Sequence, residues 1–332
     1  MDWPGGTARV GRYTVVGRLG SGGMGTVYLC RTPAGQRLAV KVIREDLAEQ
    51  SEIRLRFARE VAALREVNCP YTVPVYDAET GTPPLWLATR YVDGPTLAVR
   101  VHERGPLSTG LVQRFGLMLA EALVTVHERG VIHRDLKPGN IVLEGDEPRL
   151  IDFGIARSAA AAGGLTAPGT VLGTSGYMAP EQLTGHGPTP AVDIFALGAV
   201  LTFAATGRPP YGTGREADRR ILGAARPDLG GMPPALAPLI TACLSYAPLA
   251  RPTPLEVMAG LAALADTPTR PQRAPSRDGR RSRPVPGPPH RCHVPGPPEP
   301  GGGCALRPAA VRLLDAGLTQ ALVRKALAHH DR

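Results

Sequence analysis

The order of apolar patterns along this chain constrains its fold more than any other feature. Three short segments, at 13–19, 26–31 and 37–43, have the alternation and the β-branched residues typical of strands. A Pro-Ala-Gly turn at 33–35 separates the last two, as expected of a hairpin. This part of the chain is therefore predicted to be rich in β structure.

The pattern changes after these segments. Residues 53–67 have helical apolar spacing, and two more strand-like segments follow at 73–77 and 85–91. From about residue 97 the patterns are mainly helical, including a strongly apolar helix at 194–205. A β-rich part, a hinge and a helical remainder predict two lobes that share a cleft.

A glycine-rich segment joins the first two strand-like segments. Gly20, Gly22 and Gly25 have the spacing G-x-G-x-x-G. Glycine lets the backbone approach phosphate oxygens and offer its N–H groups to them. A dinucleotide-binding fingerprint has the same spacing but opens into a helix, whereas residues 26–30 here are strand-like. The segment therefore predicts a phosphate-binding hairpin.

Lysine is rare in this chain, which has 3 lysines and 35 arginines. Lys41 and Lys137 are the two that precede the C-terminal tail. A slim ammonium is needed where a positive group must enter a narrow site, so both are predicted to be functional. A carboxylate on the helix at 53–67 would hold Lys41, and Glu60 is favoured by its helical phase. The competing glutamates are Glu45, Glu49, Glu52 and Glu66.

One loop carries the side chains that phosphoryl transfer needs. In the string His-Arg-Asp-Leu-Lys-Pro-Gly-Asn, the carboxylate of Asp135 is followed by Lys137 and by the carboxamide of Asn140. The reaction requires a proton acceptor, a positive charge at the moving phosphoryl group and metal ligands. Asp152, in Asp-Phe-Gly, supplies a second ligand for Mg²⁺. An ordinary polar turn would explain the string at 133–140 or Asp-Phe-Gly at 152–154 if either occurred alone. The occurrence of both strings in this order favours a catalytic site.

Together these strings carry a family resemblance. Residues 13 to about 262 resemble a eukaryotic-type protein kinase domain of the serine/threonine branch found in bacteria. The matching motifs are the glycine loop at 20–25, Ala-Val-Lys ending at Lys41, the loop at 133–140, Asp-Phe-Gly at 152–154 and Ala-Pro-Glu at 179–181. The resemblance implies an α+β, two-lobed protein kinase fold. Its small lobe would have a five-stranded antiparallel sheet and one helix, and its larger lobe would be mainly helical.

The resemblance implies a role for each matching catalytic residue. Asp135 would be the catalytic base, and Lys137 would neutralise the γ-phosphate of ATP. Asn140 and Asp152 would hold Mg²⁺, or Mn²⁺ in its place.

ATP binding is also implied residue by residue. Lys41 would hold the α- and β-phosphates and pair with Glu60. Thr89 would be the gatekeeper before the hinge, whose backbone binds the adenine. Arg90 stands where an acidic residue is common, but nucleotide affinity should survive because backbone groups bind the base. The implied ATP-binding residues are Leu19, Gly20, Gly22, Gly25, Val27, Ala39, Lys41, Glu60, Thr89, Arg90, Val92 and Val142.

The remaining family positions concern specificity and support. The resemblance implies that Thr174, before Ala-Pro-Glu, would lie in the substrate groove, and with Lys137 it favours serine/threonine over tyrosine kinases. Aminoglycoside phosphotransferases share the lobes but lack such a segment. Asp193 resembles the residue that braces the catalytic loop, and Arg251 resembles the ion-pair partner of Glu181.

The loop at 155–172 is predicted to be an activation loop. Thr166 and Thr170 are the candidate phosphorylation sites, with Ser158 a weaker one. A phosphate adds about −1.5 to −2 charge and would order the loop against Arg134, which precedes the catalytic base.

Four parts are expected along the chain. They are an N-terminal extension at 1–12, a kinase domain at 13–262 with lobes at about 13–92 and 93–262, a disordered Pro/Gly/Arg-rich linker at 263–305, and a segment at 306–332 with the spacing of an amphipathic helix. Residues 266–332 carry +7 of the formal net charge of +9. A bare linker is the favoured role of this tail. Contact with anionic lipid stays open, and the spacing disfavours zinc at His290, Cys292, His293 and Cys304.

Several classes of function are disfavoured. The apolar run at 194–205 is shorter than the about 20 residues that cross a bilayer, so no transmembrane segment is expected. Scattered cysteines argue against a disulfide framework, and the expected location is cytoplasmic. The basic tail lacks interleaved aromatic residues, so nucleic acid is not an expected partner.

The predicted function is transfer of the γ-phosphoryl group of MgATP to serine or threonine hydroxyls of protein substrates, with autophosphorylation of the activation loop. The alternative is a nucleotide-binding pseudokinase scaffold, which the complete set of catalytic residues disfavours. A homodimer that phosphorylates itself in trans is plausible by analogy.

Overall fold

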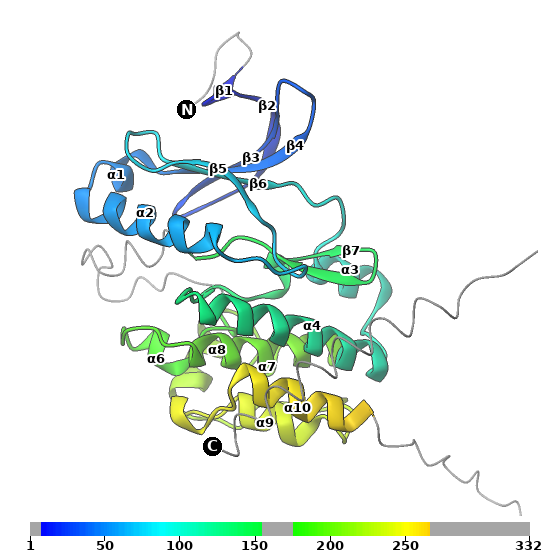
Figure 1. Ribbon diagram of the computed structural model, residues 1–332. Coiled ribbons are helices and arrows are strands. Elements are labelled where there is room, and N and C mark those ends of the chain that lie inside the picture. The colour runs from blue at the N-terminus through cyan, green and yellow to red at the C-terminus, as the bar shows by residue number, and fades with distance from the viewer. Residues whose placement is uncertain (1–7, 155–174, 266–332) are drawn as a thin grey trace, which may run out of the picture. The chain divides into compact units, whose positions relative to one another are not determined.

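The computed structural model describes residues 8–154 and 175–265. The smaller lobe is built on an antiparallel sheet, coloured blue to cyan in Figure 1. In the described residues this sheet has six strands in the order β1-β2-β3-β4-β6-β5. The strands are β1 (Arg9–Val10), β2 (Tyr13–Gly22), β3 (Gly25–Arg31), β4 (Arg37–Ile43), β5 (Val75–Glu79) and β6 (Trp86–Arg90).

The small lobe has one strand and one helix more than expected. Strand β1 pairs Val10 with Tyr13 at the edge of the sheet, and two residues are too few to form a recognisable alternation. Helix α1 (Glu45–Ala48) is a single turn that precedes α2 (Ser51–Arg65). The longer expected elements coincide with the observed ones within a few residues. Their apolar residues repeat over enough positions to distinguish a strand from a helix.

Helix α2 packs one apolar face against the rest of the protein. Ile53, Phe57, Val61 and Leu64 recur every three or four residues, and each side chain is at most 4% exposed. Burying one such side chain stabilises the fold by about 1.5–3 kcal/mol. These residues share an apolar cluster with Phe153, which follows Asp152 in the chain. The helix is therefore fixed next to the Asp-Phe-Gly segment.

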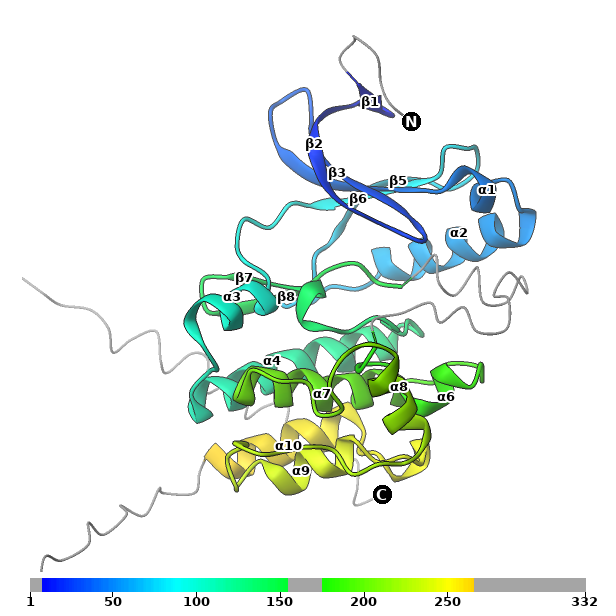
Figure 2. The ribbon, with the colours of Figure 1, turned by 180° about the vertical axis from the view of Figure 1, so that it is seen from behind.

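The large lobe is mainly helical, with a short hairpin on the side of the sheet (Figures 1 and 2). Its elements are α3 (Leu97–Arg104), α4 (Thr109–Glu128), the 3₁₀ turn η1 (Pro138–Asn140), the hairpin β7 (Ile141–Glu144) and β8 (Glu147–Leu150), α6 (Pro180–Leu183), α7 (Ala191–Thr206), α8 (Gly214–Leu222), α9 (Ala237–Cys243), η2 (Pro248–Ala250) and α10 (Pro254–Ala265). This arrangement confirms the expected α+β fold with a β-rich and a helical lobe.

Helix α7 is the core of the large lobe. Every residue at 192–202 is buried, and α4 and α9 pack against this helix. A side chain at Gly198 would place its Cβ 2.9 Å from the Cβ of Cys243 on α9. The close contact of α7 and α9 therefore requires glycine at this position.

Helix α4 has the length and apolar composition of a membrane-crossing helix, alone among the described residues. Half of its most apolar window is buried inside the protein, and α4 packs against α7 and α10. The structure thus uses α4 as a core helix of the large lobe.

Several predicted features lie outside the described residues. They are Thr166, Thr170, Thr174, Ser158, the linker beyond residue 265 and the segment at 306–332. By its internal contacts the chain divides into Met1–Asp266 and Thr267–Arg332, and the described residues all belong to the first unit.

Candidate active site

The glycine-rich segment forms the predicted hairpin between β2 and β3. Gly22 pairs with Gly25 at its tip. A Cβ at Gly25 would lie 2.0 Å from the carbonyl oxygen of Val42, so only glycine fits there. By contrast, a Cβ at Gly20 or Gly22 would meet no atom within 4 Å. The space on the Cβ side of these two glycines is therefore open.

Lys41 lies on the central strand β4, paired with Val27 on β3 and Leu87 on β6. Its Nζ forms an ion pair with Oδ1 of Asp152, and the two side chains are 19% and 32% exposed. Asp152 has a positive φ of 56°, which residues other than glycine rarely adopt. The structure thus brings together the strand lysine and the Asp-Phe-Gly carboxylate, which are 111 residues apart.

Glu60 has a different partner from the one expected. Its Oε1 accepts a hydrogen bond of 2.7 Å from Nη1 of Arg134, and both side chains are 19% exposed. The expected pair of Lys41 and Glu60 is not among the ion pairs of the described residues. The reason is the position of α2, which directs Glu60 at the catalytic loop rather than at β4.

This ion pair leaves two buried atoms unsatisfied. Oε2 of Glu60 and Nε of Arg134 are both buried and have no hydrogen-bond partner within residues 8–154 and 175–265. Buried polar atoms nearly always have partners, so this ion pair is incompletely satisfied.

The catalytic loop is held together by its own side chains. Nζ of Lys137 lies 2.9 Å from Oδ2 of Asp135. The amide nitrogen of Asn140 donates to the backbone oxygen of Asp135 at 2.8 Å and to its Oδ2 at 2.9 Å. The three residues singled out in the loop are therefore within direct contact of one another.

Asp193 braces this loop from below. Its carboxylate is fully buried and accepts the backbone N–H groups of His133 and Arg134, each at 2.8 Å. The same carboxylate contacts Nε2 of His127 on α4 at 2.8 Å. The bracing role expected for Asp193 matches this geometry. Arg134 is held with a φ of 63°, which directs its side chain towards α2.

Two histidines of this support were not predicted from the sequence. His127 contacts Asp193, and His133 packs its ring at 4.8 Å from the ring of Phe153. Burial lowers the pKa of His133 below its ordinary value, which favours the neutral ring. The motif string contained His133, but its role depends on tertiary contacts that a string does not reveal.

The residues proposed for metal binding fit a hard cation. Asn140 and Asp152 supply an amide oxygen and a carboxylate, and the backbone N–H of Ile151 donates to the carbonyl of Asn140 at 3.0 Å. Because the amide nitrogen of Asn140 is bound to Asp135, its oxygen is the atom left for a cation. In the described residues no cluster of three or more His, Cys, Asp or Glu side chains is arranged for a metal. Mg²⁺ commonly uses one or two protein ligands together with phosphates and water, so this finding is compatible with it.

The predicted adenine-binding residues lie between the two lobes. Ala39 on β4 pairs with Thr89 on β6. Val92, in the hinge, belongs to a small apolar cluster with Val142 of β7 and with Val73. Leu19, on β2, is 45% exposed. Apolar side chains from the hinge and from β7 are therefore close enough to line one site.

The Arg90 side chain contacts the large lobe. Its two terminal nitrogens donate to the two oxygens of Glu144, at 2.7 and 3.0 Å. Arg149 adds a third bond to Glu144 at 2.8 Å, and together Arg90 and Arg149 lower the pKa of Glu144 to about 2. An arginine in the hinge is thus accommodated by a carboxylate on β7.

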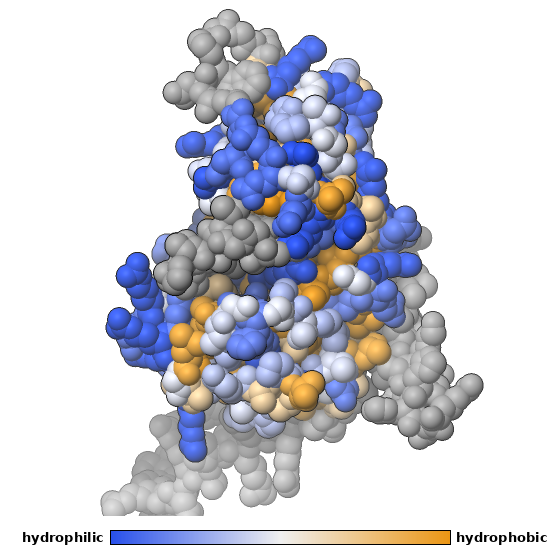
Figure 3. Space-filling model, turned by 90° about the vertical axis from the view of Figure 1, so that its left-hand side faces the viewer, coloured by the Kyte–Doolittle hydropathy of each residue, from blue (hydrophilic) through white to orange (hydrophobic). Residues whose placement is uncertain are grey.

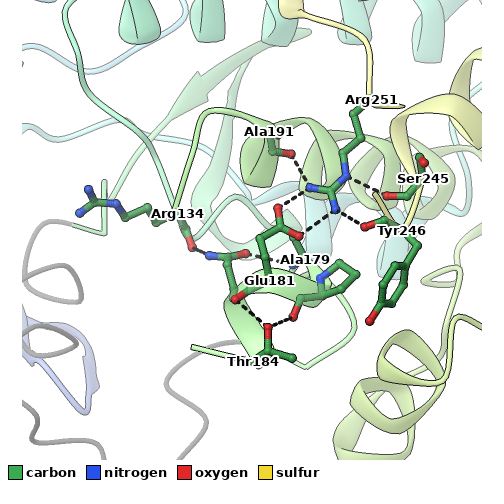
Figure 4. A network of polar contacts seen from close by, with 10 residues as sticks. Arg134, Ala179, Glu181, Thr184, Ala191, Ser245, Tyr246 and Arg251 are labelled. Carbon is green, nitrogen blue, oxygen red and sulfur yellow. Dashed lines mark hydrogen bonds and ion pairs between the residues drawn. The ribbon is translucent and has the colours of Figure 1, made fainter. Parts of the chain in front are cut away.

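Glu181 and Arg251 form the expected ion pair (Figure 4). Two parallel hydrogen bonds of 2.5 and 2.8 Å join them, and the Arg251 side chain is fully buried. Arg251 also donates to the carbonyls of Ala191, Ser245 and Tyr246. This network fixes Glu181, at the start of α6, to the core of the large lobe.

Comparison with known proteins identifies the relatives of this chain. Residues 13–260 match the family described as protein kinase domain. The chain is 46% identical over 260 residues to the probable serine/threonine-protein kinase PkwA of Thermomonospora curvata. The aligned region covers 78% of this chain and 35% of that protein. It is 44% identical over 256 residues to the serine/threonine-protein kinase AfsK of Streptomyces coelicolor, covering 76% and 32%. The chain therefore spans about a third of the length of these relatives.

A solved structure has the same fold. The crystal structure of the Mycobacterium tuberculosis PknI kinase domain superimposes with a TM-score of 0.62 and 28% sequence identity. The match covers 78% of this chain and 98% of that one.

Proposed function

The chain belongs to the protein kinase family, and on this premise we propose that it transfers the γ-phosphoryl group of MgATP to serine and threonine hydroxyls of proteins. Its similarity to bacterial serine/threonine kinases supports this reaction. The proposal includes autophosphorylation at Thr166 or Thr170, in trans within a homodimer, and a cytoplasmic location where MgATP is available.

The catalytic loop supplies the chemistry. Asp135 accepts the proton of the attacking hydroxyl, and Lys137 neutralises charge on the phosphoryl group that moves. Asn140 orients the Asp135 carboxylate through its hydrogen bond of 2.9 Å. Asp193 holds the backbone of the loop, so that these side chains keep one geometry during the reaction.

The glycine-rich hairpin, Lys41, the proposed metal ligands and the apolar residues near the hinge position the nucleotide. Gly20 and Gly22 present backbone N–H groups to its phosphates, and Lys41 binds the α- and β-phosphates. Asn140 and Asp152 would hold Mg²⁺, which when bound neutralises the charge that develops on the phosphate oxygens. The adenine would lie against Ala39, Val92 and Val142, with Thr89 behind it.

One observation carries the proposal. Asp135, Lys137 and Asn140 contact one another in a loop braced by a fully buried carboxylate, while Lys41 of β4 forms an ion pair with Asp152. No described residue favours the alternative of a scaffold without turnover, because each position that the chemistry requires is filled.

The identity of the phosphorylated residue tests this function. The full-length chain is incubated with radiolabelled ATP, Mg²⁺ and myelin basic protein, and the labelled amino acids are separated after acid hydrolysis. We expect phosphoserine and phosphothreonine, with label reduced about 10²- to 10⁴-fold in Asp135→Asn. The matched control is Asp146→Asn, an exposed aspartate of the β7–β8 turn. Labelled tyrosine, or equal labelling by Asp135→Asn, would contradict the proposal.

A further inference from the structure

A cavity of about 350 Å³ opens in the large lobe and uses no residue of the catalytic loop. We call it the α8 pocket, because Ile221 at the end of α8 lines it together with Phe195 of α7, Tyr211 and Leu244. The rings of Phe195 and Tyr211 stack at 5.8 Å, which makes one wall flat and rigid. Its volume is at the lower end of the range for ligand pockets and suits one large side chain.

The rim of the α8 pocket is unusually apolar. Tyr246 lines the pocket and is 49% exposed. Leu222 follows the lining residue Ile221, and Leu249 precedes the lining residue Ala250, with exposures of 42% and 102%. One lining residue and two residues next to lining residues in the sequence thus expose large side chains. Exposed apolar surface that adjoins a pocket is typical of a binding site.

One arginine lines the pocket, and three more lie on α8, the helix that supplies the lining residue Ile221. Arg226 lines the pocket, and Arg215, Arg219 and Arg220 lie on α8. Glu216 is 3.8 Å from Arg219 and 3.6 Å from Arg220, whereas Arg215 and Arg226 have no ion pair within the described residues. Figure 3 shows strongly hydrophilic side chains next to apolar surface on the large lobe. The surface therefore attracts a ligand with several negative charges.

The wall formed by residues 224–227 has a strained backbone. Ala224 has a φ of 49°, in the left-handed region that residues other than glycine rarely occupy. Such a conformation persists only where the surrounding structure imposes it, and it is common at ligand sites. The turn holds Ala225 and Arg226 at the opening of the pocket.

The α8 pocket shares its walls with the Glu181–Arg251 network. Ser245 and Tyr246, whose carbonyls accept from Arg251, both line the pocket, and so does Pro180, next to Glu181 (Figure 4). A ligand in the pocket would therefore contact residues that bind Arg251, the ion-pair partner of Glu181.

We propose that the α8 pocket docks a segment of a protein substrate in which one bulky apolar side chain is flanked by aspartate or glutamate. The apolar side chain fills the pocket against Phe195 and Tyr211, and the carboxylates pair with Arg226 and with the arginines of α8. A nucleic acid would match the arginines but not the recessed apolar wall, and a neutral apolar ligand would not need the arginines. The substrate assignment rests on the proposed function, whereas the binding of the segment does not.

Peptide binding tests this inference without catalysis. Fluorescence anisotropy is measured for two fluorescein-labelled peptides, Gly-Asp-Glu-Phe-Asp-Glu-Gly and the same peptide with alanine in place of phenylalanine. The protein is the full-length chain carrying Asp135→Asn, so that phosphorylation does not interfere. We expect the phenylalanine peptide to bind about tenfold more tightly, because its ring is buried in the pocket.

Three variants locate the binding site. Ala225→Phe fills the exposed opening and should abolish the preference for the phenylalanine peptide. Arg226→Glu should weaken binding of both peptides about tenfold, since it reverses one charge of the rim. Arg104→Glu makes the same charge change on α3, outside the pocket, and should bind as the parent protein does. Thermal unfolding checks that each variant is folded.

Two outcomes would overturn the inference. Equal affinity for the two peptides would show that charge alone attracts them, and full competition by single-stranded DNA that Ala225→Phe leaves unchanged would indicate a nucleic-acid surface. Because the protein used cannot transfer phosphate, either outcome leaves the proposed kinase reaction standing. Conversely, a failure of that reaction would not change the anisotropy.

Discussion

Arg134, the residue before the proposed catalytic base, donates a hydrogen bond of 2.7 Å to Glu60 of α2. The sequence resemblance predicted that Glu60 would pair with Lys41, which contacts Asp152 instead. Arg134 and Lys41 are thus the two candidate partners of the Glu60 carboxylate. In this structure Arg134 forms the ion pair with it. Within the described residues, the contact with Arg134 satisfies only one of the two carboxylate oxygens of Glu60.

Removing the Arg134 side chain should therefore raise the activity of the unphosphorylated chain. In Arg134→Gln, Glu60 is free to pair with Lys41, and we expect initial rates of phosphatase-treated protein to rise about fivefold. The gain from autophosphorylation should disappear, because Arg134 is also the proposed partner of the loop phosphate. Arg129→Gln, at an exposed neighbouring position, is the control. A lower rate in the unphosphorylated state would show that the Arg134–Glu60 pair does not restrain the enzyme.

Loss of the Asp193 carboxylate should destabilise the whole domain. Asp193→Ala leaves the buried N–H groups of His133 and Arg134 without an acceptor, at a cost of about 3 kcal/mol in the free energy of unfolding. Asp193→Asn keeps one acceptor oxygen and should cost less. Urea unfolding followed by tryptophan fluorescence measures both, with the exposed Asp146→Ala expected to change stability by less than about 0.5 kcal/mol. Equal stability of Asp193→Ala and the wild type would exclude the bracing role.

Glu181 and Arg251 should behave as one unit. Removing either partner leaves a buried charge alone, so Glu181→Gln and Arg251→Met should each cost about 3 kcal/mol of stability. The double variant should cost less than the sum, with a coupling of about 1–3 kcal/mol. The exposed pair of Arg208 and Asp228, at 4.0 Å, is the comparison and should couple by less than about 0.5 kcal/mol. Additive losses at Glu181 and Arg251 would contradict the paired geometry.

Glu144 should make the stability of the domain depend on pH in acid. Arg90 and Arg149 lower its folded pKa from 4.5 to about 2, so the unfolded state binds more protons between these values. The stability that Glu144 provides is therefore complete above about pH 4.5 and is lost as the pH falls towards 2. Urea unfolding at several pH values should give a smaller slope for Glu144→Gln than for the wild type. Glu147→Gln removes a charge from the same hairpin and should alter the slope less, and an unchanged slope in Glu144→Gln would refute this contribution.

The sequence predicted those parts of the structure whose signals are local. The strands of the sheet and helix α2 follow from apolar periods several residues long, whereas β1 and α1 are too short to show one. The contacts of Asp135 with Lys137 and Asn140 were predictable because all three lie in one loop.

The sequence could not predict features that depend on how distant segments pack. The partner of Glu60 depends on the position of α2 relative to the catalytic loop, and helical phase alone could not distinguish Lys41 from Arg134. The pairing of Arg90 with Glu144 joins the hinge to β7, 54 residues away. The α8 pocket is lined by residues scattered between 180 and 250, of which only Pro180 belongs to a motif named above.

The most direct test of the account is the steady-state kinetics of the wild type and of Asp135→Asn with ATP as the varied substrate. If Asp135 acts on the transferred proton rather than on nucleotide binding, kcat should fall by about 10² or more while the KM for ATP changes less than about threefold. A wild type that binds MgATP without turnover, or an Asp135→Asn variant that keeps its kcat, would contradict the account.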